Sequence, residues 1–360
     1  MDYKDTLMWK DISDTPEVFS NIMGANVTVM KELVSAIKNG SATNFVAAAR
    51  GASDHALIFF KYVLEVKSNY TVGLSAPSVI TLYKGKINYS NSIVIACSQS
   101  GQAADVLEVL KKGNEQGAIT VAITNDKESA IAKEAKYHLF CNAGEKRTVA
   151  ATKTFSAELF LLEWLASELS DDKEALFTLK NLKTYIERAL PDIDRETSKY
   201  AEKFKNMNSG FILARGLVYA IALEAALVLQ ETSYIHVKGY PGSEFYHGPL
   251  AMVNEGTPVV IFCAKNDGDE EIQSIIRSDQ IQCIEKMLSL KAPVLLVTND
   301  HVLTGKFARC NDALIEFSVP EEFTIFAFAL FEQMFACKIS CAIGNDPDNP
   351  RALNKVTITK

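Results

Sequence analysis

Short apolar runs alternate with amphipathic stretches along most of the chain. The runs SIVIAC (Ser92–Cys97) and PVVIFC (Pro258–Cys263) do not alternate between apolar and polar residues. Such runs are typical of strands that helices cover on both faces, as in parallel sheets. Apolar residues at helical spacing occur elsewhere, for example over residues 54–66 and 220–232. The pattern predicts an α/β fold with doubly wound parallel sheets, each forming an α/β/α sandwich.

Three landmarks of this pattern occur twice, in the same order and at nearly the same separation. The first is a short apolar run that ends in Arg-Gly and leads into a helix, and the other two are the ends of later strands. The separation is 165 residues between Arg50 and Arg215, 166 between Cys97 and Cys263, and 174 between Asp126 and Asp300. The recurrence predicts a duplicated unit, built as strand–helix–strand–helix–strand, and hence two domains in tandem.

A charged stretch with helical periodicity, Ser170–Asn208, lies between the two copies and contains Pro191 near its middle. Because proline interrupts regular helix, we expect the domain boundary in this stretch. The predicted domains are residues 1–190 and residues 191–345, followed by a C-terminal tail of residues 346–360.

Composition narrows the class of protein further. The 360 residues are 48% hydrophobic and 22% charged, an ordinary globular balance. The net charge of −7 argues against nucleic-acid binding, which needs clustered Lys and Arg. The most apolar stretch, Phe323–Ile343, contains Glu332 and Lys338, which predicts a buried helix and not a membrane span. Met1–Asp5 has no apolar signal core, so we expect a cytoplasmic protein.

The cysteines point to the same compartment. Their number is odd, and they form no CxxC pair and no His/Cys cluster. We therefore expect buried thiols in a reducing environment, not disulfides or zinc ligands. The seven cysteines are at positions 97, 141, 263, 283, 310, 337 and 341.

The two copies differ after their second strand. The first copy reads Ser98-Gln99-Ser100-Gly101, whereas the second reads AKNDG over residues 264–268. A Ser-x-Ser-Gly turn between a parallel strand and a helix directs hydroxyls and N–H groups at the positive end of the helix dipole, which favours phosphate. Gly101 permits close approach of the backbone. The alternative is an ordinary helix start that Ser100 caps.

The second copy carries its own polar segment. Glu231 ends its first helix, and His247 lies between an acidic turn and a Gly-Pro break. The ordinary pKa of histidine suits proton transfer near neutrality. The alternatives are an exposed carboxylate at a helix end and a loop histidine without a role. His236 follows an apolar pair and is expected to pack in the interior.

The tail has two prolines, which exclude regular helix, and it contains Lys355. Either it is frayed, or the apolar Leu353, Val356 and Ile358 dock it. A docked tail delivers Lys355 to a pocket where desolvation lowers its pKa toward that of a Schiff-base lysine.

With these segments the sequence closely resembles tandem sugar-isomerase (SIS) domain proteins, nearly end to end. It is most similar to the isomerase half of glutamine–fructose-6-phosphate aminotransferase and to SIS-type glucosamine-6-phosphate deaminases. The opening ARG-x-SDHA, the VAATKT segment and the ending KVT-x-T are more similar to the deaminases. The segments that carry the resemblance are ARGASDHA (49–56), SQSGQAAD (98–105), VAATKT (149–154), ALEAALVLQETSYIH (222–236), SEFYHGPLAMV (243–253) and DPDNPRALNKVT (346–357).

The resemblance implies a role for each matching residue. It implies a homodimer whose sites are shared between subunits, with a sugar phosphate as substrate and no metal or redox cofactor. In this chain, the implied phosphate ligands are Ser53, Ser98, Gln99 and Ser100, the proton shuttle between C1 and C2 is Glu231, the ring-opening acid/base supplied by the neighbouring subunit is His247, and the Schiff-base lysine is Lys355.

Three positions depart from the family pattern. Ala103 and Ala151 stand where the aminotransferase has hydroxyl residues for phosphate, and Val228 replaces a lysine found in much of the family. These departures leave the affinity for phosphate and the identity of the sugar open.

The favoured activity is release of ammonia from glucosamine-6-phosphate to give fructose-6-phosphate. The aminotransferase needs a glutaminase domain with an N-terminal cysteine, whereas this chain runs from Met1 almost directly into the first unit. A fructosamine-6-phosphate deglycase and a plain phosphosugar isomerase remain alternatives. A phosphosugar-binding regulator is an alternative of another class. Such regulators usually carry a DNA-binding segment, and no basic helix-turn-helix-like stretch precedes Met23.

Overall fold

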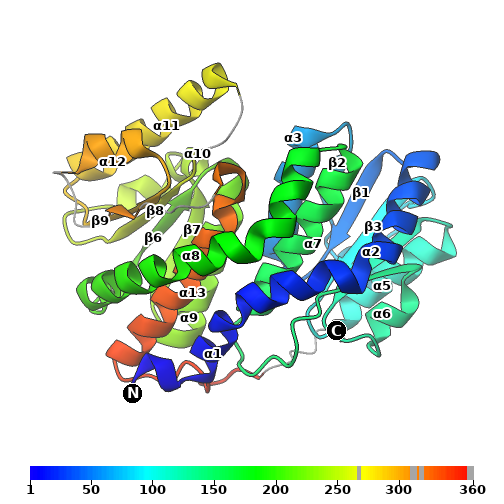
Figure 1. Ribbon diagram of the computed structural model, residues 1–360, viewed down its shortest axis with the longest axis horizontal. Coiled ribbons are helices and arrows are strands. Elements are labelled where there is room, and N and C mark those ends of the chain that lie inside the picture. Colours follow the sequence, from blue (N-terminus) through cyan, green and yellow to red (C-terminus); the bar gives the residue numbers. More distant parts are fainter. Residues whose placement is uncertain (266–268, 309–313, 316–319, 355–360) are drawn as a thin grey trace. The chain divides into compact units, whose positions relative to one another are not determined.

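The computed structural model describes residues 1–265, 269–308, 314–315 and 320–354. The chain forms two compact units (Figure 1). The first-copy unit comprises Ser13–Lys183 with the residues that follow Arg351. The second-copy unit comprises Met1–Ile12 and Thr184–Arg351.

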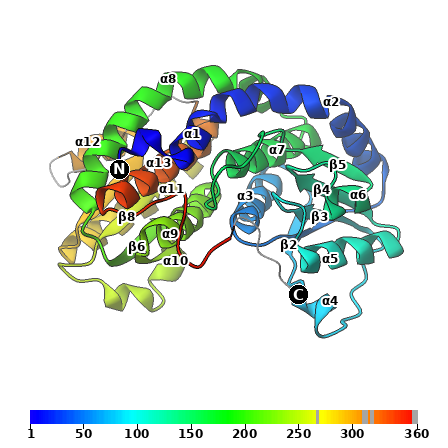
Figure 2. The ribbon, with the colours of Figure 1, turned by 90° about the horizontal axis from the view of Figure 1, so that it is seen from below.

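The first-copy unit is built on a five-stranded sheet with strand order β2-β1-β3-β4-β5, and all of its strands are parallel. Its strands are β1 (Asn44–Ala48), β2 (Thr71–Leu74), β3 (Ser92–Cys97), β4 (Ile119–Thr124) and β5 (Tyr137–Phe140). Every residue of the central strand β3 is buried, as its continuous apolar run predicts. Figure 2 shows this sheet between α2 and α7 on one side and α5 on the other.

The helices of the first-copy unit follow the strands in doubly wound fashion. The helix after β1, α3, packs against α7, and the helix after β3, α5, packs against α6. From β1 to β2 the chain moves along the sheet in one direction, and from β3 to β4 it moves in the other direction. Because such crossovers are right-handed, the two crossovers lie on opposite faces of the sheet. The helices are α2 (Thr15–Asn39), α3 (Ala52–Lys67), α4 (Ser78–Thr81), α5 (Ala104–Glu115), α6 (Ala130–Glu134) and α7 (Lys153–Leu169).

The second-copy unit has the same topology. Its parallel sheet has the order β10-β9-β8-β6-β7, which read from the other end is the order of the first sheet. Its strands are β6 (Ser209–Ala214), β7 (His236–Pro241), β8 (Val259–Cys263), β9 (Val294–Thr298) and β10 (Leu314–Ile315). The shared strand order confirms the duplication and the doubly wound α/β fold.

Each sheet has two strands more than the three predicted for a copy. The additional strands are the edge strands of each sheet. An edge strand has one hydrogen-bonding neighbour and is less covered, so it needs no continuous apolar run. In β2, for example, only Val72 is buried. The hydrophobic pattern therefore does not reveal these strands.

Helices cover both faces of the second sheet. On one face, Ile261 and Cys263 belong to the same buried cluster as Ile284 and Met287 of α11 (Glu270–Ser289). On the other face, the ring of Phe262 lies 5.4 Å from that of Phe328. Successive strand residues thus face opposite helical layers. The remaining helices are α9 (Tyr219–Ser233), α10 (Gly242–Phe245), α12 (His301–Phe307) and α13 (Thr324–Ala342), with the 3-10 turns η2 (Gly216–Val218), η3 (Pro249–Met252) and η4 (Glu321–Phe323).

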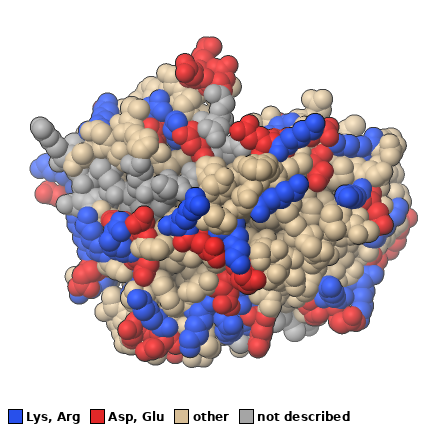
Figure 3. Space-filling view, in the orientation of Figure 1, with Lys and Arg blue, Asp and Glu red and all other residues tan. Residues whose placement is uncertain are grey.

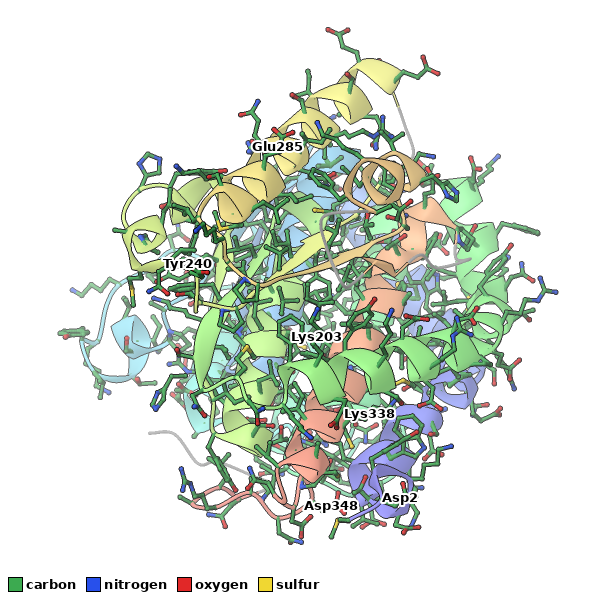
Figure 4. The ribbon with its side chains drawn as sticks, turned by 90° about the vertical axis from the view of Figure 1, so that its left-hand side faces the viewer. Asp2, Lys203, Tyr240, Glu285, Lys338 and Asp348 are labelled. Carbon is green, nitrogen blue, oxygen red and sulfur yellow. The ribbon has the colours of Figure 1, made fainter. Side chains whose placement is uncertain are left out.

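The charged stretch between the copies is one helix, α8 (Lys173–Phe204), with Pro191 inside it. The N-terminal turn η1 (Tyr3–Asp5) and α1 (Leu7–Ser13) begin the chain, and residues Met1–Ile12 group with the second-copy unit. Lys338 of α13, labelled in Figure 4, explains this grouping. Its ammonium contacts Asp194 Oδ1 of α8 at 2.5 Å and lies 4.7 Å above the Tyr3 ring.

Two described helical stretches are long and apolar enough to cross a membrane, Gly216–Ser233 and α13. They are 61% and 94% buried inside the protein, as expected of core helices. The prediction of a buried helix at Phe323–Ile343 is confirmed. The six cysteines in the described part of the chain are buried free thiols, as predicted, whereas Cys310 lies outside the described residues.

Candidate functional site

The loop Ser98–Gly101 lies at the carboxyl end of β3, where the chain turns toward α5. The Gly101 N–H donates to the Ser98 carbonyl at 3.0 Å, which closes the turn. The Gln99 carbonyl accepts from the Asn125 N–H at 2.9 Å, and this bond ties the loop to the end of β4. The loop therefore has a fixed shape at the carboxyl edge of the sheet, where ligands of doubly wound folds bind.

Gly101 is required at its position for two reasons. Its φ of +62° lies in the left-handed region. A Cβ there would lie 2.1 Å from Ser129 Oγ and 2.3 Å from Ser129 Cβ. The backbone of the loop is thus packed directly on the start of α6.

The loop has hydrogen-bond donors that no protein acceptor occupies. Within the described part of the chain, the backbone N–H groups of Gln99, Ser100 and Ala104 have no protein acceptor. The N-cap of α5 is Ala103, whose side chain makes no capping bond. The alternative in which Ser100 caps the helix is wrong, because Ser100 Oγ accepts instead from the Gln102 N–H at 3.3 Å. Free N–H groups at a helix N-terminus are the usual donors of an anion site.

Ser53 lies in the first turn of α3, at the same edge of the sheet. Its hydroxyl donates to Glu158 Oε1 of α7 at 2.8 Å, and both side chains are buried. Burial raises the pKa of the neighbouring Cys97 thiol well above its usual range, and the nearby Glu158 carboxylate raises it further. Sequence reasoning missed Glu158. The available signal was a carboxylate in a helix that is otherwise almost wholly buried.

Glu231 lies near the C-terminal end of α9 and is half-buried. The end of this helix is tied to α13 and to the residues beyond it, because the Thr232 carbonyl accepts from Ser340 Oγ at 2.8 Å and from Asn345 Nδ2 at 3.3 Å. Tyr234 ends the helix in the left-handed conformation, with φ of 58°. Glu231 therefore stands on a rigid backbone, as a positioned acid or base requires.

Two further carboxyl groups lie beside this helix. Glu224 is two turns before Glu231 on the same face of α9, and Glu332 faces them from α13, with both residues fully buried. Neither oxygen of Glu332 has a hydrogen-bond partner in the described part of the chain. Burial raises the pKa of Glu332 well above its usual range, and Glu224 and Glu231 raise it further. Burial among carboxyl groups therefore favours the neutral form of Glu332.

His247 lies in the turn between α10 and η3 and is exposed, as predicted for a loop histidine. Its N–H donates to the Glu244 carbonyl at 3.0 Å, which fixes the turn. The prediction that His236 packs in the interior is wrong. His236 begins the edge strand β7 and is exposed, because the side chains of an edge strand alternate between the interior and solvent.

The tail docks through polar residues. The Asp348 carboxylate, labelled in Figure 4, accepts from the Leu7 and Met8 N–H groups at 2.7 and 2.8 Å. The Arg351 N–H donates to Tyr234 Oη at 3.0 Å, and the Arg351 guanidinium lies 4.0 Å from the Tyr234 ring. Of the three apolar residues considered for docking, Leu353 is 42% exposed and does not fill that role. Lys355, Val356 and Ile358 lie outside the described residues.

The structure brings the predicted phosphate ligands together at one edge of the first-copy sheet, and it places Glu231 and His247 in the second-copy unit. Among the described residues, no group of three His, Cys, Asp or Glu side chains is arranged to hold a metal ion. Figure 3 shows Lys and Arg interspersed with Asp and Glu over the described part of the visible face.

These features define a duplicated, doubly wound protein in which one copy has a Ser-x-Ser-Gly loop before a helix N-terminus. Residues 41–168 and 203–336 match the family described as the SIS domain. The chain is 33% identical over 362 residues to glutamine–fructose-6-phosphate aminotransferase [isomerizing] of Aquifex aeolicus, covering 98% of this chain and 57% of that protein. It thus spans little more than half the length of that relative.

Solved structures agree on the fold. The C-terminal domain of glucosamine-fructose-6-phosphate aminotransferase from Francisella tularensis has a TM-score of 0.82 and 26% identity, over 96% of this chain and 98% of that chain. Glucosamine-6-phosphate deaminase from Thermotoga maritima has a TM-score of 0.70 over 98% of this chain and 99% of that chain. Its 21% identity supports the fold alone. The chain belongs to the SIS-domain family.

Proposed function

We propose that the chain is a phosphosugar isomerase that acts at C1 and C2 of a hexose 6-phosphate. The observation that carries the proposal is the Ser98–Gly101 loop. Its free N–H groups and its two serine hydroxyls at the start of a helix suit a phosphate group, and the chain matches the SIS family over both copies.

The chemistry assigned to the second-copy unit is a proton transfer between two carbons. Glu231 takes the proton from C2 of the open-chain sugar and returns a proton to C1, which converts the aldehyde into a ketose-like product. A carboxylate on a fixed helix end suits a transfer between two adjacent carbons. His247 is assigned to ring opening in the site of a second copy of the chain, so the working protein is a homodimer. Lys355 is assigned to Schiff-base formation.

The finer proposal is that glucosamine-6-phosphate is the substrate. Moving the C2 proton to C1 leaves a ketimine at C2. Water then adds to C2 and ammonia leaves, which gives fructose-6-phosphate. A fructosamine-6-phosphate deglycase uses the same kind of proton transfer in the opposite direction. The proton moves from C1 to C2, water adds to the resulting imine at C1, and an amino acid leaves, which gives an aldose 6-phosphate.

The test measures the released amine and the ketose or aldose 6-phosphate formed from glucosamine-6-phosphate, fructosyl-amino-acid 6-phosphates and glucose-6-phosphate. Glu231→Gln keeps the shape of the side chain and removes the base, so kcat is expected to fall by about 10²–10⁴ with KM similar. Glu255→Gln, at an exposed carboxylate of the same unit, is the matched control and keeps activity.

Each outcome assigns or removes an activity. A fully active Glu231→Gln enzyme refutes the proposed base. Ammonia release from glucosamine-6-phosphate supports the deaminase, and cleavage of fructosyl-amino-acid phosphates alone replaces it with the deglycase. A protein that binds these sugars but turns over none of them is a phosphosugar-binding regulator.

A further inference from the structure

Arg50 lies two residues after Ala48, the last residue of strand β1 in the first-copy unit. Its Nε and Nη2 both donate to Asp105 Oδ2, at 2.8 and 2.6 Å. The Asp105 side chain is only 3% exposed, whereas that of Arg50 is 48% exposed. The buried carboxylate therefore holds a half-exposed guanidinium in one place. The Nη1 group takes no part in this ion pair.

The ion pair lies beside the phosphate loop. Strands β1 and β3 are parallel neighbours, with Ala48 opposite Ala96, so Arg50 and Ser98 leave the sheet at the same edge. Asp105 is the second residue of α5, the helix that the loop enters. The guanidinium is thus fixed at the first turn of the helix whose free N–H groups face the anion site. The N-cap at this corner is Ala103, which offers no hydroxyl.

We propose that Arg50 is a further ligand of the substrate phosphate, held in position by Asp105. The proposal rests on the proposed function, because it takes the Ser98–Gly101 loop as the phosphate site. A guanidinium is always charged, and its fork of N–H donors fits a phosphate through two parallel hydrogen bonds. It adds the positive charge that serine hydroxyls and backbone N–H groups cannot supply to a dianion.

The second copy supplies a comparison within the same molecule. Arg215 directly follows the end of β6, close to where Arg50 stands after β1, and it forms an ion pair with Asp279. Asp279, however, lies nine residues after Glu270, the first residue of α11, and so more than two turns into that helix. The ion pair occurs in both copies, but only in the first does it stand at the helix start beside the Ser-x-Ser-Gly loop.

The test compares the dissociation constant of inorganic phosphate, measured by calorimetry, for Arg50→Met and Arg215→Met. Each variant removes the ion pair of its own copy, with Asp105 or with Asp279, and keeps an unbranched side chain. Loss of a charged ligand is expected to weaken phosphate binding by about 10- to 100-fold in Arg50→Met. Arg215→Met is expected to bind phosphate as the wild type does. Thermal melting of both variants confirms folding, and Arg50→Gln, which can still donate to Asp105, replaces Arg50→Met if that variant does not fold.

Asp105→Asn separates a ligand role from a structural one. The amide oxygen of asparagine can accept both hydrogen bonds that Asp105 Oδ2 accepts, so the guanidinium keeps its position while its charge is no longer neutralised. Phosphate binding is therefore expected to be unchanged or tighter. If Arg50→Met and Asp105→Asn weaken phosphate binding equally, the ion pair supports the loop structure and Arg50 is not a ligand. That result overturns the proposal. Unchanged binding in Arg50→Met, or an equal loss in Arg215→Met, also overturns it.

Turnover of glucosamine-6-phosphate, measured in parallel, distinguishes this inference from the proposed function. An active wild type whose KM is unchanged in Arg50→Met refutes the role of Arg50 alone. A wild type that binds phosphate in an Arg50-dependent manner but turns over no sugar phosphate refutes the proposed activity and supports the phosphate site.

Discussion

Replacing Gly101 with alanine tests whether the shape of the phosphate loop depends on its packing against Ser129. The new Cβ would lie 2.1 Å from Ser129 Oγ, so Ser129 or the loop must move. Ser129 is itself held, because its hydroxyl donates to the Asp126 carbonyl at 2.7 Å and accepts from the Ala132 N–H at 3.3 Å as the N-cap of α6. A shift of Ser129 therefore breaks the cap.

The expected loss of stability has three parts. Alanine in the left-handed region costs about 1–2 kcal/mol. Loss of the Ser129 cap costs about 1 kcal/mol, and loss of its other hydrogen bond costs about 1 kcal/mol. Gly101→Ala is thus expected to destabilise the first-copy unit by about 3–4 kcal/mol. Gly117→Ala is the matched control, since Gly117 has φ of +77° and nothing within 4 Å of its Cβ position. It is expected to lose only the backbone part, about 1–2 kcal/mol.

The assay is urea unfolding followed by tryptophan fluorescence. The chain has two tryptophans, and Trp164 belongs to the first-copy unit and Trp9 to the other. A Trp9→Phe background therefore makes the signal report on the first-copy unit. Phosphate binding is measured on the same proteins and is expected to weaken in Gly101→Ala alone. If the two alanine variants unfold at the same urea concentration, or if Gly101→Ala binds phosphate normally, the packing argument is refuted.

Two further predictions concern the second-copy unit. Because burial raises the folded-state pKa of Glu332, the stability linked to its proton is present below the unfolded pKa of about 4.3 and is lost as pH rises toward the folded value. Glu332→Gln cannot ionise, so its melting temperature relative to the wild type is expected to increase from pH 5 to pH 8, and a constant difference contradicts this. If His247 acts in the site of a second subunit, mixing inactive Glu231→Gln and His247→Ala proteins restores part of the activity. No recovery after verified subunit exchange counts against shared sites.

The hydrophobic pattern was sufficient to predict the central strands, because their residues are buried on both faces. Strand β3 has the predicted bounds Ser92–Cys97. The edge strands were missed because partial exposure allows polar residues, and the same partial exposure explains why His236 is exposed. Pro191 marks the stretch between the copies but does not end the helix there. Here the packing of α8 prevails over the local cost of a proline.

The parts of the candidate site that consist of consecutive residues could be predicted from the sequence. The parts that depend on contacts between distant residues could not. The Ser-x-Ser-Gly loop is visible as a motif, and its asymmetry between the copies needs no structure. The bond from Ser53 to Glu158 joins residues 105 apart in sequence. The ion pair of Arg50 with Asp105 joins residues 55 apart. No spacing rule links such pairs, because the sheet alone brings their elements together.

The contact between Gly101 and Ser129 has a consequence for how a ligand binds. A loop whose backbone packs against a neighbouring helix cannot close over its ligand. It does not need to, because the N–H groups of Gln99, Ser100 and Ala104 already have no acceptor in the described part of the chain. Little conformational entropy is then lost on association. Phosphate is expected to bind in a single step whose rate is set by diffusion and by the local charge, without a slower isomerisation of the protein.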